Sequence, residues 1–433
     1  MSHIVIAGCV GVGHAIPTLD TIAELVARGH RVTCVTVPLA AATLAPTGAH
    51  IVPIDSVLAT VDLTVMDTVT ELDRLMVLGV EEDRRFIAAV EEYAELQGRP
   101  DLLVFDATRF AVGRILGTKW GVPTAAFCTV QLSNEHFSFQ ERVDAKRGAL
   151  PRRRPHVARA MRGLMSLLAE HGQSHRSLDE FYRAEEGLYV AFYPREFQFS
   201  GETFDDRYTF VGPNLTIGTD PGGWRPPADG RRVLMVSLGT SVFRNPGFYR
   251  ACVDAFRDSD WQVVLHAHKG LDLDAVGELP PNVEVHGWLP QLAVLAHTDV
   301  LICHGGLGTL MAAFAEATPV VVVPNSGEQM VNGDRVAELG LGRVLAQQEI
   351  TAAGLRASVE ELHADQGVRA RVGDMSAAIR RAGGGAHGAD AVEGYLKVAG
   401  DRAREDNMSG ACGANRRTQG DRERLPGACE GES

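Results

Sequence analysis

The sequence predicts an α/β protein of two consecutive domains, each with a doubly wound parallel sheet. Short, continuous apolar runs at residues 102–106 and 300–303 are typical of strands that are buried on both faces of such a sheet. Segments with helical apolar spacing alternate with these runs, and the whole pattern restarts after a stretch rich in Gly, Pro and Asp. The length of 433 residues also favours two domains. Two such halves imply two facing domains with a cleft between them.

The first half opens with a strand, a loop, a helix and a second strand. Residues 3–7 are expected to form a buried strand, and a helix with Pro17 near its start and Gly29 at its end leads to a strand at 30–37. Further strands are expected at 102–106, 123–129, 189–192 and 208–211, while 60–100 and 137–181 are expected to be mainly helical. The basic cluster at 152–156 is interpreted as a solvated loop.

The second half follows a linker at 216–231. Strands are expected at 233–237, 262–266, 283–286, 300–303 and 319–324, and helices near 248–257, 309–317, 330–339 and 389–398. Residues 400–433 contain almost nothing apolar and are expected to be disordered. The expected domains are therefore 1–215 and 232–380, followed by a helical segment at 381–399 and the tail.

Composition limits the possible partners. The net charge is −13 and no broad basic face is evident, which argues against a nucleic-acid partner. The seven cysteines are scattered without the pairs typical of metal sites, and Cys9, Cys34, Cys128 and Cys303 lie in or beside apolar runs, where cysteine acts as a small buried hydrophobe. The N-terminus lacks the features of a signal peptide, and no apolar run approaches a membrane span. We therefore expect a soluble, cytoplasmic protein.

A glycine-rich elbow, His304-Gly-Gly-Leu-Gly-Thr309, separates the strand at 300–303 from the following helix. Glycines allow the backbone to approach a ligand closely, and the free N–H groups at the start of a helix form an anion site. The elbow therefore predicts a bound phosphate.

The residues around this elbow carry a resemblance. They are Trp288-x-Pro290-Gln291, His304-Gly-Gly-x-Gly-Thr309, Pro319, and Glu328-Gln329 followed by Asn332. This pattern resembles the nucleotide-sugar signature of family 1 glycosyltransferases, in particular the bacterial enzymes that glycosylate macrolides and other polyketides. The resemblance extends from residue 1 to about residue 398. It implies the GT-B architecture, in which two Rossmann-like domains face each other, the first binds the acceptor, the second binds the donor, and a last helix crosses back to the first domain.

His14 and Asp106 are the candidate catalytic residues. His14 follows the first strand, and Asp106 lies at the carboxyl end of the strand at 102–106, the edge of an open α/β sheet where ligands bind. Histidine can take a proton from an alcohol near neutral pH. In the family that the chain resembles, a histidine here is the general base and an aspartate orients it. The alternative is a histidine capped by backbone at a helix start, beside a structural aspartate.

The donor site is expected in the second domain. His304, Gly306, Gly308 and Thr309 should hold the diphosphate. Ser237 and Thr240 could add hydroxyl contacts, or their hydroxyls could simply form a turn. Trp288 is expected to stack on the nucleobase, and the alternative is an isolated Trp-Pro turn. Glu328 and Gln329 are expected to bind the sugar hydroxyls, and the alternative is a helix N-cap. Gln291 belongs to the signature, but its role stays open.

One position departs from the family pattern. Relatives that use UDP-sugars usually carry a ribose-binding glutamate eight positions after the signature histidine, and Ala312 stands there in this chain. That favours a dTDP-deoxysugar donor, whereas the pair Glu328-Gln329 suits a hydroxyl-rich hexose. The acidic pairs Asp258/Asp260 and Asp272/Asp274 match a metal-binding DxD pattern, but they are interpreted as caps, and no metal is expected.

The combined expectation is an inverting, metal-independent glycosyltransferase. It would move a hexose from a dTDP- or UDP-sugar, which is a substrate and not a cofactor, to a hydroxyl of an apolar natural product. Alternatives are a catalytically silent helper protein of the same fold and a sugar-nucleotide epimerase. A dinucleotide-dependent oxidoreductase is disfavoured, because the first loop has the order GxxGxG and no acidic residue ends the second strand. The acceptor, a role in antibiotic biosynthesis or inactivation, and the oligomeric state stay open.

Overall fold

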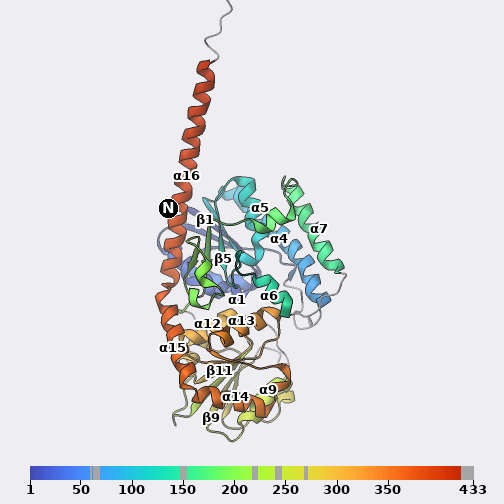
Figure 1. Cartoon of the computed structure of the whole chain (residues 1–433), viewed down its shortest axis with the longest axis vertical. Helices are drawn as coiled ribbons and strands as arrows, with labels where there is room; N and C mark the ends of the chain where they lie inside the picture. Colours follow the sequence, from blue (N-terminus) through green and yellow to red (C-terminus); the bar gives the residue numbers. More distant parts are fainter. Residues whose placement is uncertain are drawn as a thin grey trace, which may run out of the picture.

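The computed structural model describes residues 1–58, 61, 69–146, 154–216, 223–238, 246–267 and 272–420. Figure 1 shows two α/β lobes, one above the other, with the long helix α16 (Gly384–Gly420) running along the first lobe. The first lobe contains a seven-stranded sheet in the order β3-β2-β1-β4-β5-β6-β7, and the second a six-stranded sheet in the order β10-β9-β8-β11-β12-β13. Neighbouring strands pair in parallel throughout both sheets. The predicted fold class is confirmed.

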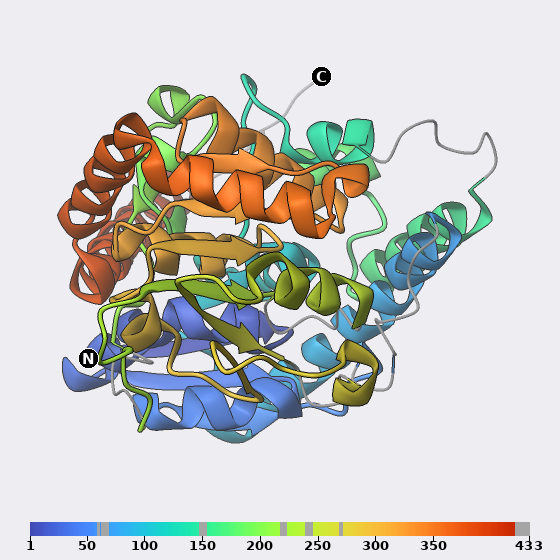
Figure 2. The ribbon, with the colours of Figure 1, turned by 90° about the horizontal axis from the view of Figure 1, so that it is seen from below.

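The first lobe alternates strands and helices along the chain. Its strands are β1 (His3–Cys9), β2 (Arg31–Thr36), β3 (His50–Pro53), β4 (Leu102–Asp106), β5 (Thr124–Cys128), β6 (Leu188–Ala191) and β7 (Tyr208–Phe210). Its helices are α1 (Val12–Ala15), α2 (Leu19–Ala27), α3 (Pro38–Leu44), α4 (Val69–Gln97), α5 (Phe110–Trp120), α6 (Phe139–Lys146), α7 (Pro155–Glu170) and α8 (Leu178–Arg183). Helices α4 and α7 pack side by side and project from the body of the lobe (Figure 2).

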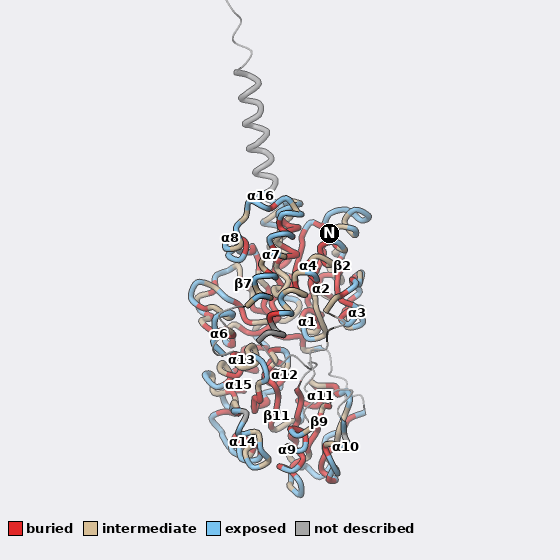
Figure 3. Tube along the Cα trace, turned by 90° about the vertical axis from the view of Figure 1, so that its right-hand side faces the viewer, coloured by how far each residue is buried: buried red, intermediate tan, exposed pale blue. Residues whose placement is uncertain are grey.

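The second lobe repeats the alternation. Its strands are β8 (Arg232–Ser237), β9 (Trp261–His266), β10 (Val283–His286), β11 (Val300–Cys303), β12 (Val320–Val322) and β13 (Gly342–Val344). Its helices are α9 (Pro246–Phe256), α10 (Leu273–Val276), α11 (Gln291–Leu295), α12 (Leu307–Ala315), α13 (Gly327–Glu338), α14 (Ala352–Ala364) and α15 (Gln366–Arg381). The buried residues follow the strands of both sheets and the inner faces of the helices (Figure 3). Burial of these continuous apolar runs is the main driving force for each lobe.

Each sheet has a point at which the strand order reverses. Strand β1 pairs with both β2 and β4, and β8 pairs with both β9 and β11. At such a point the two crossovers leave in opposite directions, which opens a crevice at the carboxyl ends of the central strands. The loops after β1, β4, β8 and β11 therefore line the ligand-binding edges of the two sheets.

One expectation for the first lobe is confirmed and one needs correction. The stretch at 60–100 is mainly helical as expected, because it contains the long helix α4; residues 59–60 and 62–68 lie outside the described residues. The basic cluster is not a plain solvated loop, because Arg154 Nε donates to Asp73 Oδ2 at 2.9 Å and Pro155 begins α7. Asp73 is only 4% exposed, and a carboxylate removed from water needs such a charged partner. Arg152 and Arg153 lie outside the described residues.

The C-terminal segment also differs from expectation. Disorder was expected from residue 400, whereas α16 continues as a helix to Gly420. The first part of α16 packs on α2, where Arg28 Nη1 bonds Asp390 Oδ1 and Glu393 Oε2 at 2.7 Å each. Extending a helix that is already nucleated costs far less than starting one, so weak local propensity suffices beyond the packed part. Residues 421–433 lie outside the described part of the chain.

None of the helices in the described part of the chain is both long enough and apolar enough to cross a membrane.

Glycine allows α16 to approach α2 closely, which generates a prediction. A Cβ atom at Gly385 would lie 2.5 Å from the backbone carbon of Asp20, whereas a Cβ at Gly394 of the same helix meets nothing within 4 Å. We expect Gly385→Ala to lower the free energy of unfolding by about 1–3 kcal/mol through overpacking. The matched control Gly394→Ala should raise it by up to about 1 kcal/mol through helix propensity. Urea denaturation measures both, and equal effects would contradict the close packing.

Candidate functional site

The first half of the site lies at the reversal point of the first sheet. Near the end of β1 the strand is irregular at Gly8, which has φ +93°, and a Cβ there would lie 2.8 Å from Cβ of Arg109. Only glycine fits this close crossing of the loops after β1 and β4. The crossing brings His14 on the short helix α1 next to Asp106 at the end of β4, although 92 positions separate them in the sequence.

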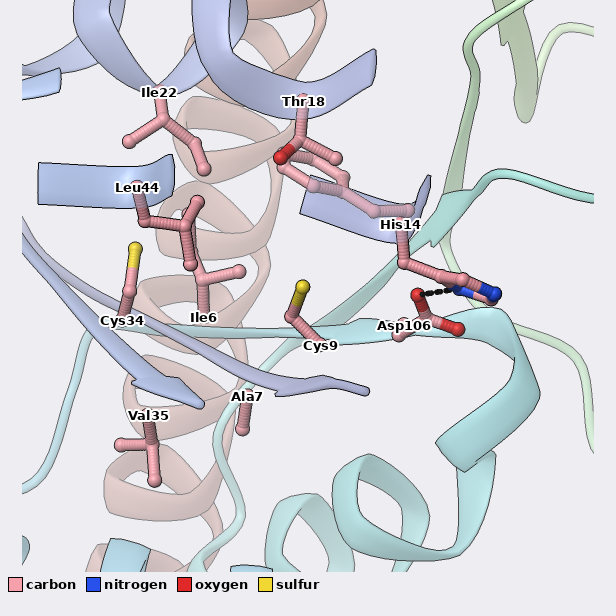
Figure 4. Close-up of a pocket in the computed structure, with 11 residues that line it drawn as sticks. Ile6, Ala7, Cys9, His14, Thr18, Ile22, Cys34, Val35, Leu44 and Asp106 are labelled. Carbon is pink, nitrogen blue, oxygen red and sulfur yellow. Dashed lines mark hydrogen bonds and ion pairs between the residues drawn. The ribbon is translucent and has the colours of Figure 1, made fainter. Parts of the chain in front are cut away.

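His14 and Asp106 form a direct pair. His14 Nδ1 lies 2.7 Å from Asp106 Oδ2, and Figure 4 shows the two side chains pointing toward each other. Thr129 Oγ1 lies 2.9 Å from the same nitrogen. The other carboxylate oxygen, Oδ1, accepts hydrogen bonds from Thr108 N at 2.9 Å and Thr108 Oγ1 at 2.6 Å. Within the described part of the chain both side-chain hydrogen bonds of His14 use Nδ1, which leaves Nε2 for a ligand.

The charges around this pair favour an ionised Asp106 and a strengthened base. Burial by itself would lower the pKa of His14, but the charge and hydrogen bond of Asp106, together with Glu328, raise it overall against the opposing charge of Arg109. Burial by itself would raise the pKa of Asp106, but His14 and Thr108 hold it below its usual range. The arrangement matches a general base with its orienting carboxylate.

A small apolar pocket extends from the pair into the first lobe (Figure 4). Cys9 lies on its wall, and burial, followed by the charge of Asp106, raises the pKa of this thiol to about 12. The thiol is therefore neutral and packs as a hydrophobe. The expectation of buried cysteines is confirmed for Cys34, Cys128 and Cys303, whereas Cys9 is partly exposed.

The second half of the site is the elbow after β11. Gly305 has φ +88°, and a Cβ there would lie 2.8 Å from Val322 Cγ1, so the turn requires glycine. Gly306 is the N-cap of α12, and no side chain caps this helix. The ring of His304 lies against Gly306, because a Cβ added at Gly306 would lie only 2.4 Å from Nε2 of His304. The first N–H groups of α12 are therefore open to an anion.

His304 is neutral. Burial lowers its pKa to about 4, against a hydrogen bond with the backbone of Ser237. Its Nδ1 is buried and has no hydrogen-bond partner within the described residues. A neutral imidazole carries one N–H donor, so this ring can offer a hydrogen bond to a diphosphate but not a positive charge.

The start of α13 separates the roles of two predicted residues. The helix begins at Gly327, and Ser326 caps it by accepting from Gln329 N at 3.4 Å, so the alternative that Glu328 and Gln329 form the N-cap is wrong. Gln329 nevertheless takes part in the turn, because its Oε1 accepts from Asn325 N at 2.8 Å. Glu328 is half-buried, and burial raises its pKa overall, although the charge of His14 in the other lobe acts in the opposite direction. The charges of Glu328 and His14 therefore interact, although the two residues belong to different lobes.

The remaining donor candidates differ in availability. Trp288 is 68% exposed, which leaves its ring open for stacking. Gln291 begins α11, and its Nε2 is buried without a hydrogen-bond partner in the described residues. Ser237 is buried, and its Oγ lies 3.2 Å from His266 Nδ1, so this hydroxyl already has an internal partner. Thr240 lies outside the described residues.

Sequence reasoning missed several residues of the site. Thr108 follows Asp106 by two positions, the spacing at which a carboxylate caps a following turn, so this partner was readable. Thr129 follows β5 at the same sheet edge, which is a usable signal as well. Arg109 packs against Gly8 and its charge acts on His14, but no local motif marks it in the sequence.

The acidic DxD pairs have structural roles. Asp272 accepts from Ala275 N at 3.2 Å and caps the start of α10, as expected. Asp260 is not a cap but an ion-pair partner of Arg232. Among the residues that the structure describes, no three His, Cys, Asp or Glu side chains are grouped to hold a metal ion.

Comparison with known proteins agrees with this arrangement. Residues 250–381 match the family model described as "Erythromycin biosynthesis protein CIII-like, C-terminal domain". Demethyllactenocin mycarosyltransferase of Streptomyces fradiae is 35% identical over 92% of this chain and 87% of the relative. Oleandomycin glycosyltransferase of Streptomyces antibioticus is 32% identical over 93% of this chain and 92% of the relative.

Solved structures show the same fold. The calicheamicin glycosyltransferase CalG4 superposes with a TM-score of 0.81 at 38% identity, covering 92% of this chain and 98% of that one. The glycosyltransferase VinC in complex with DTDP superposes with a TM-score of 0.64 at 18% identity, covering 92% of this chain and 100% of that one, which is a likeness of fold alone. By its fold, its signature and its full-length relatives, this chain belongs to the bacterial family 1 natural-product glycosyltransferases and is a sugar-transferring enzyme.

Proposed function

We propose that this enzyme is an inverting, metal-independent glycosyltransferase. It moves a hexose from a dTDP- or UDP-sugar to a hydroxyl of an apolar natural product such as a macrolide or polyketide. The observation that carries the proposal is the His14–Asp106 pair, at 2.7 Å, in electrostatic contact with Glu328 of the opposite lobe. His14, the base, belongs to one lobe, and Glu328, which is predicted to bind the sugar, belongs to the other. A two-substrate transfer requires that two such groups come together.

On the acceptor side, His14 Nε2 takes the proton of the acceptor hydroxyl. Asp106 holds Nδ1–H and stabilises the imidazolium that forms, which is the role of the carboxylate in a base–orienter pair. The acceptor oxygen then bonds to the anomeric carbon as the bond from that carbon to the diphosphate breaks. Attack from the face opposite the leaving group converts an α-linked D-sugar donor to a β-glycoside.

On the donor side, the nucleoside diphosphate leaves with the electrons of the broken bond. The open N–H groups at Gly306, Gly308 and Thr309 and the neutral ring of His304 are aimed where this charge develops, so they stabilise the transition state without a metal. The engagement of Asp260 by Arg232 supports a metal-independent mechanism. Trp288 stacks on the base of the nucleotide.

The sugar and nucleoside contacts define the donor class. Among the described residues no hydrogen bond occupies the Glu328 carboxylate, so it can accept from sugar hydroxyls. Gln329, whose Oε1 is used in the turn, keeps its amide N–H groups for the sugar. Ala312 offers no carboxylate to a ribose 2′-hydroxyl, which supports a dTDP donor. VinC, a fold relative, was solved with DTDP.

The base is tested by His14→Ala. We expect transfer to fall by about 10²–10⁴-fold, the usual contribution of general base catalysis, while binding of the nucleoside diphosphate persists. Turnover is followed by release of the nucleoside diphosphate, and binding by calorimetry. Transfer at the wild-type rate in this variant would refute the role of His14.

The pH dependence follows from the raised pKa of His14. The base acts when it is deprotonated, so kcat/KM should fall as the pH drops below this pKa. Asp106→Asn removes the charge that raises the pKa, so the acidic limb should move to lower pH while the plateau rate falls. A limb that stays in place would show that another group controls it.

Donor choice is tested at position 312. Ala312→Glu restores the carboxylate that relatives use for ribose hydroxyls, so the ratio of kcat/KM for UDP-glucose to that for dTDP-glucose should rise by about tenfold, the value of one hydrogen bond to a charged group. Ala312→Gln is a matched control of equal length and should give a smaller change. A wild-type enzyme that already prefers UDP-glucose would refute the inference from Ala312.

A further inference from the structure

The two lobes are joined by polar contacts on one face of α13, outside the predicted catalytic and donor residues. Gln131 of the first lobe is 3% exposed, and its Nε2 donates to Asn332 Oδ1 at 3.3 Å. Asn332 is 1% exposed, and its Nδ2 donates to Gly305 O at 3.0 Å. A buried chain of hydrogen bonds therefore runs from the first lobe, through α13, to the glycine elbow of the second lobe.

The carbonyl of Gly305 is a sensitive point of the elbow. Its oxygen and the N–H of Gly306 belong to the same planar peptide group, in which the two point in opposite directions. Asn332 therefore fixes the orientation of the Gly306 N–H when it holds the Gly305 oxygen. Gly306 caps α12 and is one of the donors predicted for the diphosphate.

The other end of the chain lies near the base. Gln131 is two residues beyond Thr129, whose Oγ1 lies 2.9 Å from His14 Nδ1. Gln131 Oε1 also accepts from Phe199 N at 3.5 Å, which holds the loop after β5 against the segment at Phe199 within the same lobe. One short loop thus contacts both the base and the helix that orients the elbow.

Arg335, one turn after Asn332, attaches the same face of α13 to the first lobe. Its guanidinium donates to three successive carbonyls, those of Glu196 at 2.9 Å, Phe197 at 3.0 Å and Gln198 at 2.9 Å. The side chain is 11% exposed and also pairs with Glu338 at 2.8 Å. Helices α6 and α13 face each other across the lobe boundary at this place (Figure 1).

We propose that Gln131, Asn332 and Arg335 form an interlobe joint that sets the orientation of the diphosphate-binding amide at Gly306. They are positioning residues, because none of them is predicted to touch a substrate. The joint makes the affinity for the nucleotide sugar depend on the contact between the first lobe and α13. The Gly306 N–H is therefore oriented toward the diphosphate when the first lobe, which carries His14, is packed against α13. The inference rests on the proposed function in taking the elbow as the diphosphate site.

The test measures the affinity of the full-length enzyme for dTDP and UDP by calorimetry. Gln131→Met keeps the length of the side chain but removes its amide, and it lies in the lobe that does not hold the donor. We expect it to raise the Kd of the tighter-binding nucleotide by about tenfold, the effect of leaving one buried polar partner unsatisfied. Asn332→Leu should raise it at least as much, and the double variant should be no weaker than Asn332→Leu, because both act through one chain of contacts.

Lys146→Met is the matched control. Lys146 Nζ and Asp334 Oδ2, 2.7 Å apart, form an exposed ion pair between the same two helices. An exposed pair contributes little, and it does not reach Gly305, so the nucleotide Kd should not change. A change equal to that of Gln131→Met would mean that any loosening of the lobes weakens binding, which would overturn the proposed chain.

Thermal melting of each variant separates positioning from loss of stability. A Gln131→Met enzyme that melts at lower temperature but binds nucleotide normally would overturn the proposal, as would additive effects in the double variant. If Asn332→Leu does not fold, Asn332→Asp replaces it, since this variant keeps an acceptor for Gln131 but loses the donor to Gly305 and should still raise the Kd. A wild-type enzyme that binds neither dTDP nor UDP would refute the proposed function itself.

Discussion

The parallel pairing of one central strand with two neighbours is the constraint on which both halves of the site depend. In the first sheet Ala7 of β1 is in register with Phe105 of β4, so the two strands end within two residues of this pair, at the same edge of the sheet. That register brings His14 and Asp106 together. In the second sheet Cys303 of β11 is in register with Ser237 of β8, which places the elbow beside the backbone that contacts His304. A slip by one residue would send each side chain to the other face.

Two histidines show how environment divides one side-chain type between two tasks. His14 sits beside an ionised carboxylate, so its pKa is raised and it is suited to accept a proton. His304 is buried without a charged partner, so its pKa is lowered to about 4 and it remains neutral. Because the imidazole of His304 is a neutral hydrogen-bond donor, the protein avoids the cost of burying a cation before the anionic nucleotide sugar binds. Neither state could be inferred from the residue type alone.

Much of the fold was predictable because buried parallel strands have a strong local signal. The strands at 102–106 and 300–303 were predicted with their observed bounds. Strands β3 and β13 were missed because they are short and mostly half-exposed, which removes the continuous apolar run. The sequence offers several polar residues that could cap α13, and the structure shows that Ser326 accepts the backbone N–H. The contact between Gln131 and Asn332 spans 201 positions and has no local pattern that could reveal it.

The return of α16 to the first lobe has a mechanical consequence. The chain passes between the lobes once after β7 and again at Gly383 and Gly384, and Gly384 N donates to Val211 O at 2.8 Å, so the two passages lie side by side. Both glycines have positive φ values, a conformation that suits a pivot. A rotation about this single edge moves every point in proportion to its lever arm. Glu196 of the first lobe bonds both Arg335 and Arg381 of the second lobe, which adds a polar anchor between the two lobes.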